Sequence, residues 1–268
     1  MQPIESAGPA VPWRLIDTAP APGAWNMAVD EALAASVAAG GDPVLRFYRW
    51  EPACLSLGRN QPARGRYDLE ALAAAGIDVV RRPTGGRAVL HRRELTYSVA
   101  APEAMFGGPR QAYAAINRAL VAGLRRLGAA AELQPPGGRA PPPSLAPCFA
   151  EPVEGEVVAG GRKLVGSAQR RLGGTLLQHG SLPLHDDQSL VATFVVGGDH
   201  AAAEAPPAAL VEVLGREPAW PELTAALAAG WEDALGAVLA PSELSAEERE
   251  AAGAAMERYA GPAWTWHQ

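Results

Sequence analysis

The stretch that decides the fold is RRPTGGRAVLH, residues 81–91. A strand-like run at residues 78–83 leads into the glycines Gly85 and Gly86, and a second run follows at residues 88–91. Glycines let backbone N–H groups approach an anion or a carbonyl oxygen closely, and arginines on both sides add positive charge. A Gly-Gly turn by itself is most often a plain hairpin. With its arginines, this turn indicates either a hairpin or a site for an anionic ligand.

Hydrophobic periodicity outside this turn predicts a mixture of strands and helices. Strands are expected at residues 13–17, 44–50, 54–59, 78–83, 88–91, 95–101, 156–159, 163–171 and 175–182. Helices are expected at residues 26–39 (capped by Asn26), 67–75, 111–127, 223–239 and 246–259. The order of elements has no βαβ rhythm, so the predicted fold class is α+β.

Composition excludes several classes of protein. Apolar residues make up 48% of the 268 residues, which is enough for a sizeable core. A net charge of -6 argues against a general nucleic-acid binder. The sequence contains no run of about 18 uncharged apolar residues, so no membrane span is predicted. Residues 1–12 lack the pattern of a signal peptide and are expected to form a tail. Two cysteines make no disulfide framework, so we expect a reducing, cytoplasmic location.

The two cysteines have different surroundings. Cys54 lies in an apolar strand, ACLSL, and is expected to act as a small core residue. Cys148 follows a loop, residues 135–147, that contains six prolines. A thiol on such a loop can reach a large substrate, although an inert loop cysteine is the alternative.

Lysine is the rarest charged residue, with a single Lys163 against 22 arginines. Only lysine offers a compact ammonium whose pKa falls on burial, so this position either needs an amine or keeps a surface lysine by chance. Strand alternation puts Lys163, Val165, Ser167 and Gln169 on one face, which is either a polar cluster or a solvated face. His179 is either a base or a structural histidine, and no metal-ligand spacing is present.

Six segments, in this order, resemble the biotin/lipoate protein ligase superfamily. They are NMAVDEAL (26–33), RFYRW (46–50), RRPTGGRAVLH (81–91), ELTYS (94–98), KLVGSAQ (163–169) and QHGS (178–181). Within the superfamily, the chain resembles the octanoyltransferases of the lipoate pathway, which carry a cysteine ahead of the lysine strand. The resemblance extends over about residues 13–260.

The resemblance implies mixed, largely antiparallel sheets flanked by helices. It implies a catalytic acyltransferase domain at residues 13–215, with residues 216–268 as a helical extension packed on it. Cys148 would be the nucleophile and Lys163 would lie near the acyl carbonyl. The expected substrate-binding residues are Arg82, Thr84, Gly85, Gly86, Arg87, His91, Ser167, Gln169 and His179.

The expected reaction moves octanoyl from an acyl carrier protein to a lysine of a lipoyl-accepting protein, with no cofactor and no metal. The acceptor would be the glycine cleavage H protein or a dehydrogenase E2 subunit. Such partners are typically acidic, so docking needs a basic face. The candidate residues for that face are Arg81, Arg82, Arg87, Arg92, Arg93, Arg162, Arg170 and Arg171.

Three other functions stay open at this point. An ATP-dependent lipoate or octanoate ligase would share the motifs but would not need Cys148. An amidotransferase between two lipoyl domains would use the same nucleophile with a different donor. A non-catalytic member of the superfamily would bind acyl-carrier domains without turnover.

Overall fold

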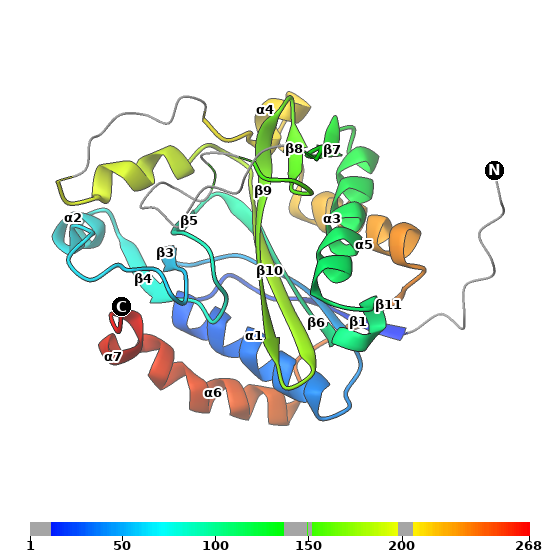
Figure 1. Ribbon diagram of the computed structural model, residues 1–268, viewed down its shortest axis with the longest axis horizontal. Helices are drawn as coiled ribbons and strands as arrows, with labels where there is room; N and C mark the ends of the chain where they lie inside the picture. The colour runs from blue at the N-terminus through cyan, green and yellow to red at the C-terminus, as the bar shows by residue number, and fades with distance from the viewer. Residues whose placement is uncertain (1–11, 137–148, 150–151, 198–205) are drawn as a thin grey trace.

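The computed structural model describes residues 12–136, 149, 152–197 and 206–268 (Figure 1). Its strands are β1 (Pro12–Asp17), β2 (Val44–Tyr48), β3 (Ala53–Leu57), β4 (Ile77–Arg81), β5 (Val89–His91), β6 (Glu94–Pro102), β7 (Ala131–Leu133), β8 (Val157–Ala159), β9 (Arg162–Leu172), β10 (Thr175–Pro183) and β11 (Val238–Ser242). Its helices are α1 (Gly23–Ala38), α2 (Leu69–Ala74), η1 (Glu103–Phe106), α3 (Pro109–Arg126), η2 (Gln188–Phe194), α4 (Leu210–Leu214), α5 (Trp220–Leu235), α6 (Ala246–Ala260) and α7 (Pro262–Thr265).

The strands form one large and one small sheet. The large sheet has the order β11-β1-β2-β6-β10-β9-β8-β7, and the small sheet has the order β4-β3-β5. Pairs from β2 to β7 along the large sheet are antiparallel, whereas β1 pairs with β2 and β11 in parallel. Gly173 and Gly174 turn the long β9–β10 hairpin with φ of +57° and +86°, values that favour glycine. The α+β class and the mixed, largely antiparallel sheets are therefore confirmed.

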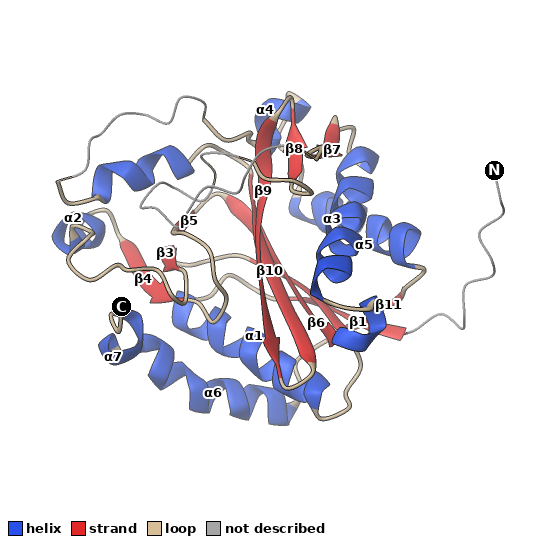
Figure 2. Ribbon diagram, in the orientation of Figure 1, coloured by secondary structure: helices blue, strands red, loops and turns tan. Residues whose placement is uncertain are grey.

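Helices cover both faces of the large sheet (Figure 2). Helices α3 and α5 bury one face in a core that includes Trp13, Leu124 and Trp231. They approach backbone to backbone, since a Cβ on Gly230 would lie 2.1 Å from the Gly123 nitrogen. Helices α1 and α6 bury the other face in a second core. None of the helices in the described ranges is long and apolar enough to cross a bilayer.

The structure departs from the sequence prediction at helix α1 and at the end of helix α5. Helix α1 begins at Gly23, and Asn26 is a buried residue inside it, not its cap. The Asn26 amide instead bonds the carbonyls of Ala21 and Arg49. The helix predicted at residues 223–239 ends at Leu235, because Gly236 takes a left-handed conformation. Residues 238–242 then form β11. A short apolar run such as this one is compatible with either a strand or a helix.

Candidate active site

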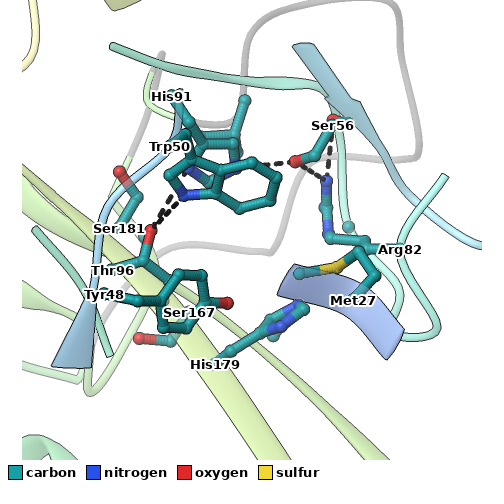
Figure 3. A pocket seen from close by; sticks show the side chains of 15 residues that line it. Met27, Tyr48, Trp50, Ser56, Arg82, His91, Thr96, Ser167, His179 and Ser181 are labelled. Atoms are coloured by element: carbon teal, nitrogen blue, oxygen red, sulfur yellow. Dashed lines mark hydrogen bonds between the residues drawn. The ribbon is translucent and has the colours of Figure 1, made fainter. Parts of the chain in front are cut away.

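A pocket opens between the β9–β10 hairpin and the small sheet (Figure 3). It holds about 400 Å³ of empty space, its open mouth included. Of the residues expected to bind substrate, five line it: Arg82, Gly86, His91, Ser167 and His179. Apolar side chains in the lining include Met27, Trp50 and Val89. An apolar pocket with a few polar groups is typical of a small-molecule site.

The glycine turn forms one wall of the pocket, and Arg82 holds it in place. The Arg82 guanidinium donates to the Gly85 carbonyl at 2.7 Å and to the Arg87 carbonyl at 2.7 Å. Gly58 packs so closely on the turn that a Cβ there would lie 1.9 Å from the Gly86 carbonyl oxygen. Gly86 itself has φ of +91°. The turn is therefore fixed by carbonyl contacts as well as by glycine conformation.

Arg81 and Arg82 are buried, so the prediction that they belong to an exposed docking face is wrong. The Arg81 guanidinium is fully buried and donates to backbone carbonyls of Gln61 at 2.9 Å and Thr265 at 2.8 Å. Peptide carbonyls compensate for the lost hydration of these cations. Arg81 thus joins α7 to the loop beside the turn, a role that the arginine-rich sequence did not reveal.

A buried network, here called the Asp30 cluster, lies on the α1 side of the pocket. The Asp30 carboxylate accepts hydrogen bonds from Arg46 at 2.8 Å, Tyr48 at 2.9 Å and Ser98 at 2.8 Å. It also bonds Nδ1 of His179 at 3.1 Å. Residues from four of the six sequence segments therefore meet at this one carboxylate.

The Asp30 cluster fixes the orientation of His179. Burial alone would raise the pKa of Asp30, but the His179 hydrogen bond and the charge of Arg46 outweigh it and lower the pKa below its ordinary value. An ionised Asp30 keeps the proton of His179 on Nδ1. Nε2 then faces the Thr84 hydroxyl of the glycine turn. His179 therefore connects the hairpin to the turn, as a positioning residue for both walls.

His91 lies in the opposite wall, stacked on Trp50 with ring centroids 4.0 Å apart. Its Nε2 bonds the Ser56 hydroxyl at 2.8 Å, and its Nδ1 lies 3.4 Å from the Glu94 carboxylate. Burial lowers the pKa of His91, although Glu94 opposes the shift. A neutral His91 with its proton on Nδ1, facing Glu94, accepts a hydrogen bond at Nε2 from the Ser56 hydroxyl. The Ser56 oxygen in turn accepts a hydrogen bond from Arg82.

Lys163 forms a buried ion pair beyond the end of the β9–β10 pairing. Its Nζ donates to the Glu156 carboxylate at 2.7 Å and lies 5.5 Å from the centroid of the Phe149 ring. Phe149 packs on Gly166 so closely that a Cβ there would lie 2.8 Å from the ring. Because Gly166 lines the pocket, this phenyl ring connects the lysine with the pocket wall.

The predicted common face of β9 is only partly present. Ser167 and Gln169 do share a cluster, in which the Ser167 hydroxyl lies 2.7 Å from the Tyr97 hydroxyl and the Gln178 amide bonds the same Tyr97. The Gln169 amide is 2.6 Å from that of Gln178 and does not line the pocket. A register shift between β8 and β9 interrupts the alternation at the lysine, since a bulge adds one residue.

Cys148 lies outside the described residues, as does most of the proline-rich loop. Cys54 is fully buried, and burial raises its pKa well above the ordinary thiol value. The prediction that Cys54 is an inert core residue is confirmed. In the described ranges, no three His, Cys, Asp or Glu side chains gather as metal ligands would.

Sequence reasoning missed several residues of the site. Asp30, Glu94 and Thr96 lay inside the quoted segments but were not named as site residues, and Ser56 and Glu156 lay outside those segments. A polar residue within an apolar strand, as at Thr96, is the pattern that could have found some of them.

The fold and the pocket define the class of protein. Residues 22–231 match the family described as the lipoyl protein ligase A/B catalytic domain, and the chain belongs to that family. Octanoyltransferase LipM of Kyrpidia tusciae is 43% identical over 271 residues, which span 96% of this chain and 99% of the relative. Octanoyltransferase LipM of Symbiobacterium thermophilum is 41% identical over 268 residues, spanning 94% and 97%.

Solved structures share the fold. Protein Ta0514 of T. acidophilum, with bound lipoic acid, is 25% identical and superposes with a TM-score of 0.78. The match covers 96% of this chain and 99% of that one. The fold predicted from the resemblance is therefore confirmed.

Proposed function

We propose that the protein is a cytoplasmic octanoyltransferase that moves octanoyl from the thioester of an acyl carrier protein to a lysine of a lipoyl-accepting protein. The full-length similarity to enzymes of that name supports the activity. The observation that carries the mechanism is a pocket whose wall residue Gly166 contacts Phe149, with the only lysine of the chain beside that ring. Phe149 directly follows Cys148 in the sequence.

The first step transfers the acyl group to Cys148. The Cys148 thiolate attacks the octanoyl carbonyl, a new C–S bond forms, and the bond to the carrier sulfur breaks. The carrier thiolate leaves with a proton from the Lys163 ammonium, which becomes neutral. Exchange of one thioester for another is close to thermoneutral, so ATP is not required. The Lys163 ammonium supports this step by favouring the thiolate and by donating to the developing oxyanion.

The second step forms the amide. The acceptor lysine loses one proton to solvent before its amine attacks the Cys148 thioester. The C–S bond to Cys148 then breaks and the thiolate is expelled, while the second proton of the amine passes to Lys163, which the first step left neutral. Lys163, in its neutral form, is the preferred base. Glu156, which accepts its hydrogen bond at 2.7 Å, then stabilises the ammonium that results.

The pocket residues bind the acyl chain and its carbonyl. Met27, Trp50 and Val89 offer the apolar surface that an octanoyl chain requires. The glycine turn that forms one wall includes Arg82, Thr84, Gly85, Gly86 and Arg87. The polar part of the lining includes His91, Ser167 and His179. Gln169 supports the hairpin behind it.

A transfer assay without ATP tests the proposal. Octanoyl carrier protein and two acceptors, an H protein and an E2 lipoyl domain, are incubated with the enzyme, and octanoyl-lysine is measured by mass spectrometry. We expect product with at least one acceptor and none with Cys148→Ala. Product that requires ATP, releases pyrophosphate and survives Cys148→Ser would establish a ligase instead. Product only from an octanoylated lipoyl domain would establish the amidotransferase.

A further inference from the structure

A second hollow, here called the basic groove, lies where α1, α6 and the β9–β10 hairpin meet. Three arginines from three separate segments line it: Arg59, Arg170 and Arg258. Alanines of α1 and Leu172 supply an apolar floor, and Trp264 of α7 closes one side. None of these three arginines lines the acyl pocket, so binding of the acyl chain does not explain why they lie together.

The positive charge of the groove is not balanced by its own carboxylates. Glu31 is the acidic residue of the lining, and it is already engaged by Arg258 at 2.7 Å and by the Tyr259 hydroxyl. Within the described ranges, Arg59 and Arg170 form no ion pair. Burial lowers the pKa of Arg170, and the neighbouring charges of Arg59 and Arg258 lower it further, although Tyr259 and Glu31 oppose the shift. Guanidiniums held together in this way favour a bound anion.

Other contacts hold the two unpaired arginines in place. Trp264 lies under Arg59, with the guanidinium carbon 5.5 Å from the ring centroid. The Arg59 backbone N–H donates to the Thr84 carbonyl at 2.8 Å, and the Arg170 guanidinium reaches the Pro83 carbonyl at 3.4 Å. Both arginines therefore belong to segments that touch the glycine turn of the acyl pocket, so the groove and the pocket share a wall.

The distance along β9 fits one kind of substrate. Gly166 and Ala168 line the acyl pocket, and Arg170 lines the basic groove on the same strand. Four residues of extended chain span about 13 Å. In a phosphopantetheine arm, about thirteen bonds separate the thioester sulfur from the phosphorus, roughly the length of four extended residues. A thioester held at the pocket wall can therefore place its phosphate in the groove.

We propose that the basic groove binds the phosphate of the acyl donor's pantetheine arm through Arg59 and Arg170. The inference rests on the proposed function, since it takes the donor to be a thioester on such an arm. The groove would then select donors that carry a phosphate, and it would fix the direction in which the arm leaves the acyl pocket.

Two small donors test the proposal. Octanoyl-4′-phosphopantetheine and octanoyl-pantetheine differ only in the phosphate, and transfer from each to an H protein is measured at constant ionic strength. We expect the intact enzyme to prefer the phosphorylated donor about tenfold in kcat/KM, as charge-assisted hydrogen bonds predict. Arg170→Gln and Arg59→Gln should remove most of that preference while leaving the rate with octanoyl-pantetheine within about twofold.

A matched variant controls for the loss of one positive charge. Arg126→Gln removes an exposed arginine of α3, on the other side of the large sheet, where it pairs with Asp233. It should keep the full preference for the phosphorylated donor. A preference that is absent in the intact enzyme, or that survives in Arg170→Gln and Arg59→Gln, overturns the proposal.

The protein-bound donor separates this proposal from the proposed function. If octanoyl carrier protein reacts but neither small donor does, inorganic phosphate is added as a competitor. Inhibition that is lost in Arg170→Gln but kept in Arg126→Gln supports the groove, and equal inhibition overturns it. If no donor of any kind reacts, the proposed function itself is wrong.

Discussion

The Asp30 cluster and the Lys163–Glu156 pair are both buried and charged, yet they are assembled differently. Asp30 gathers partners that are 16, 18, 68 and 149 residues away in the sequence, from β2, β6 and β10. Lys163 and Glu156 are only 7 residues apart, on either side of β8 and one turn. The first arrangement requires the whole fold, whereas the second requires a single hairpin. We therefore expect Asp30 to contribute mainly to the free energy of unfolding, and Lys163 mainly to the rate of octanoyl transfer.

The largest effect should come from Asp30→Ala. This change leaves the fully buried Arg46 guanidinium without its counter-charge, and removing one partner of a buried ion pair costs about 3–5 kcal/mol. Since domains are stable by only about 5–15 kcal/mol, the variant should unfold at much lower urea or fail to fold. Asp233→Ala, at an exposed ion pair, should cost less than about 1 kcal/mol. A loss below 1 kcal/mol at Asp30 would show that the cluster does not support the fold.

Lys163→Arg should separate rate from stability. The charge is kept, but the bulkier guanidinium cannot place its donors as the ammonium does, nor act as a neutral base. We expect kcat for octanoyl transfer to fall by about 100-fold or more. The loss of unfolding free energy should stay near 1–2 kcal/mol, the cost of overpacking. The neighbouring Arg162→Lys, at a half-buried position on the same strand, serves as control. Turnover within a few-fold of normal in Lys163→Arg would remove this lysine from the mechanism.

The pH dependence of unfolding tests the surroundings of a third buried group, the His91 ring. Its pKa in the folded state lies below the ordinary value, because burial disfavours the charged ring. The unfolded chain therefore takes up a proton near pH 6.5 that the folded chain does not, and stability is lost as pH falls through that value. The slope from this one group is at most about 1.4 kcal/mol per pH unit. Unfolding measured between pH 8 and 5 should show a weaker slope for His91→Gln.

An exposed histidine provides the comparison for this pH test. His267→Gln should keep the slope of the unaltered protein. Equal slopes for the unaltered protein and His91→Gln would mean that His91 is not held neutral by its surroundings.

The smallest effect should come from Ser98→Ala. It removes one of the four donors to Asp30, whose other bonds come from Arg46, Tyr48 and His179. A hydrogen bond to a charged acceptor contributes roughly 1.5–3 kcal/mol, so Tm should fall by several degrees. Ser189→Ala, at an exposed bond to Asp186, should leave Tm unchanged. A fall as large as that of Asp30→Ala would mean that the cluster acts as a single unit.

The sequence predicted the local part of this account and missed the long-range part. The glycine turn and the single Lys163 stand out in the sequence by themselves, because turn chemistry and composition are local properties. The site roles expected of Thr84, Gly85, Gly86, Lys163 and His179 came from the resemblance to the superfamily. The bond from Arg81 to the Thr265 carbonyl could not be predicted, because the two residues are 184 positions apart in the sequence. Strand β11 was missed, and its first two residues were assigned to a helix, because its pairing with β1 joins residues more than 200 positions apart. The position of Cys148 relative to Lys163 stays a prediction.

The most direct test of the mechanism is to determine the mass of the intact enzyme after incubation with octanoyl carrier protein in the absence of ATP. The mechanism predicts a gain of one octanoyl group, labile to hydroxylamine, that maps to the peptide containing Cys148 and is absent in Cys148→Ala. The adduct should form slowly in Lys163→Arg. Rapid transfer to the acceptor with no octanoyl bound to the enzyme, or an equal adduct in Cys148→Ala, would contradict it.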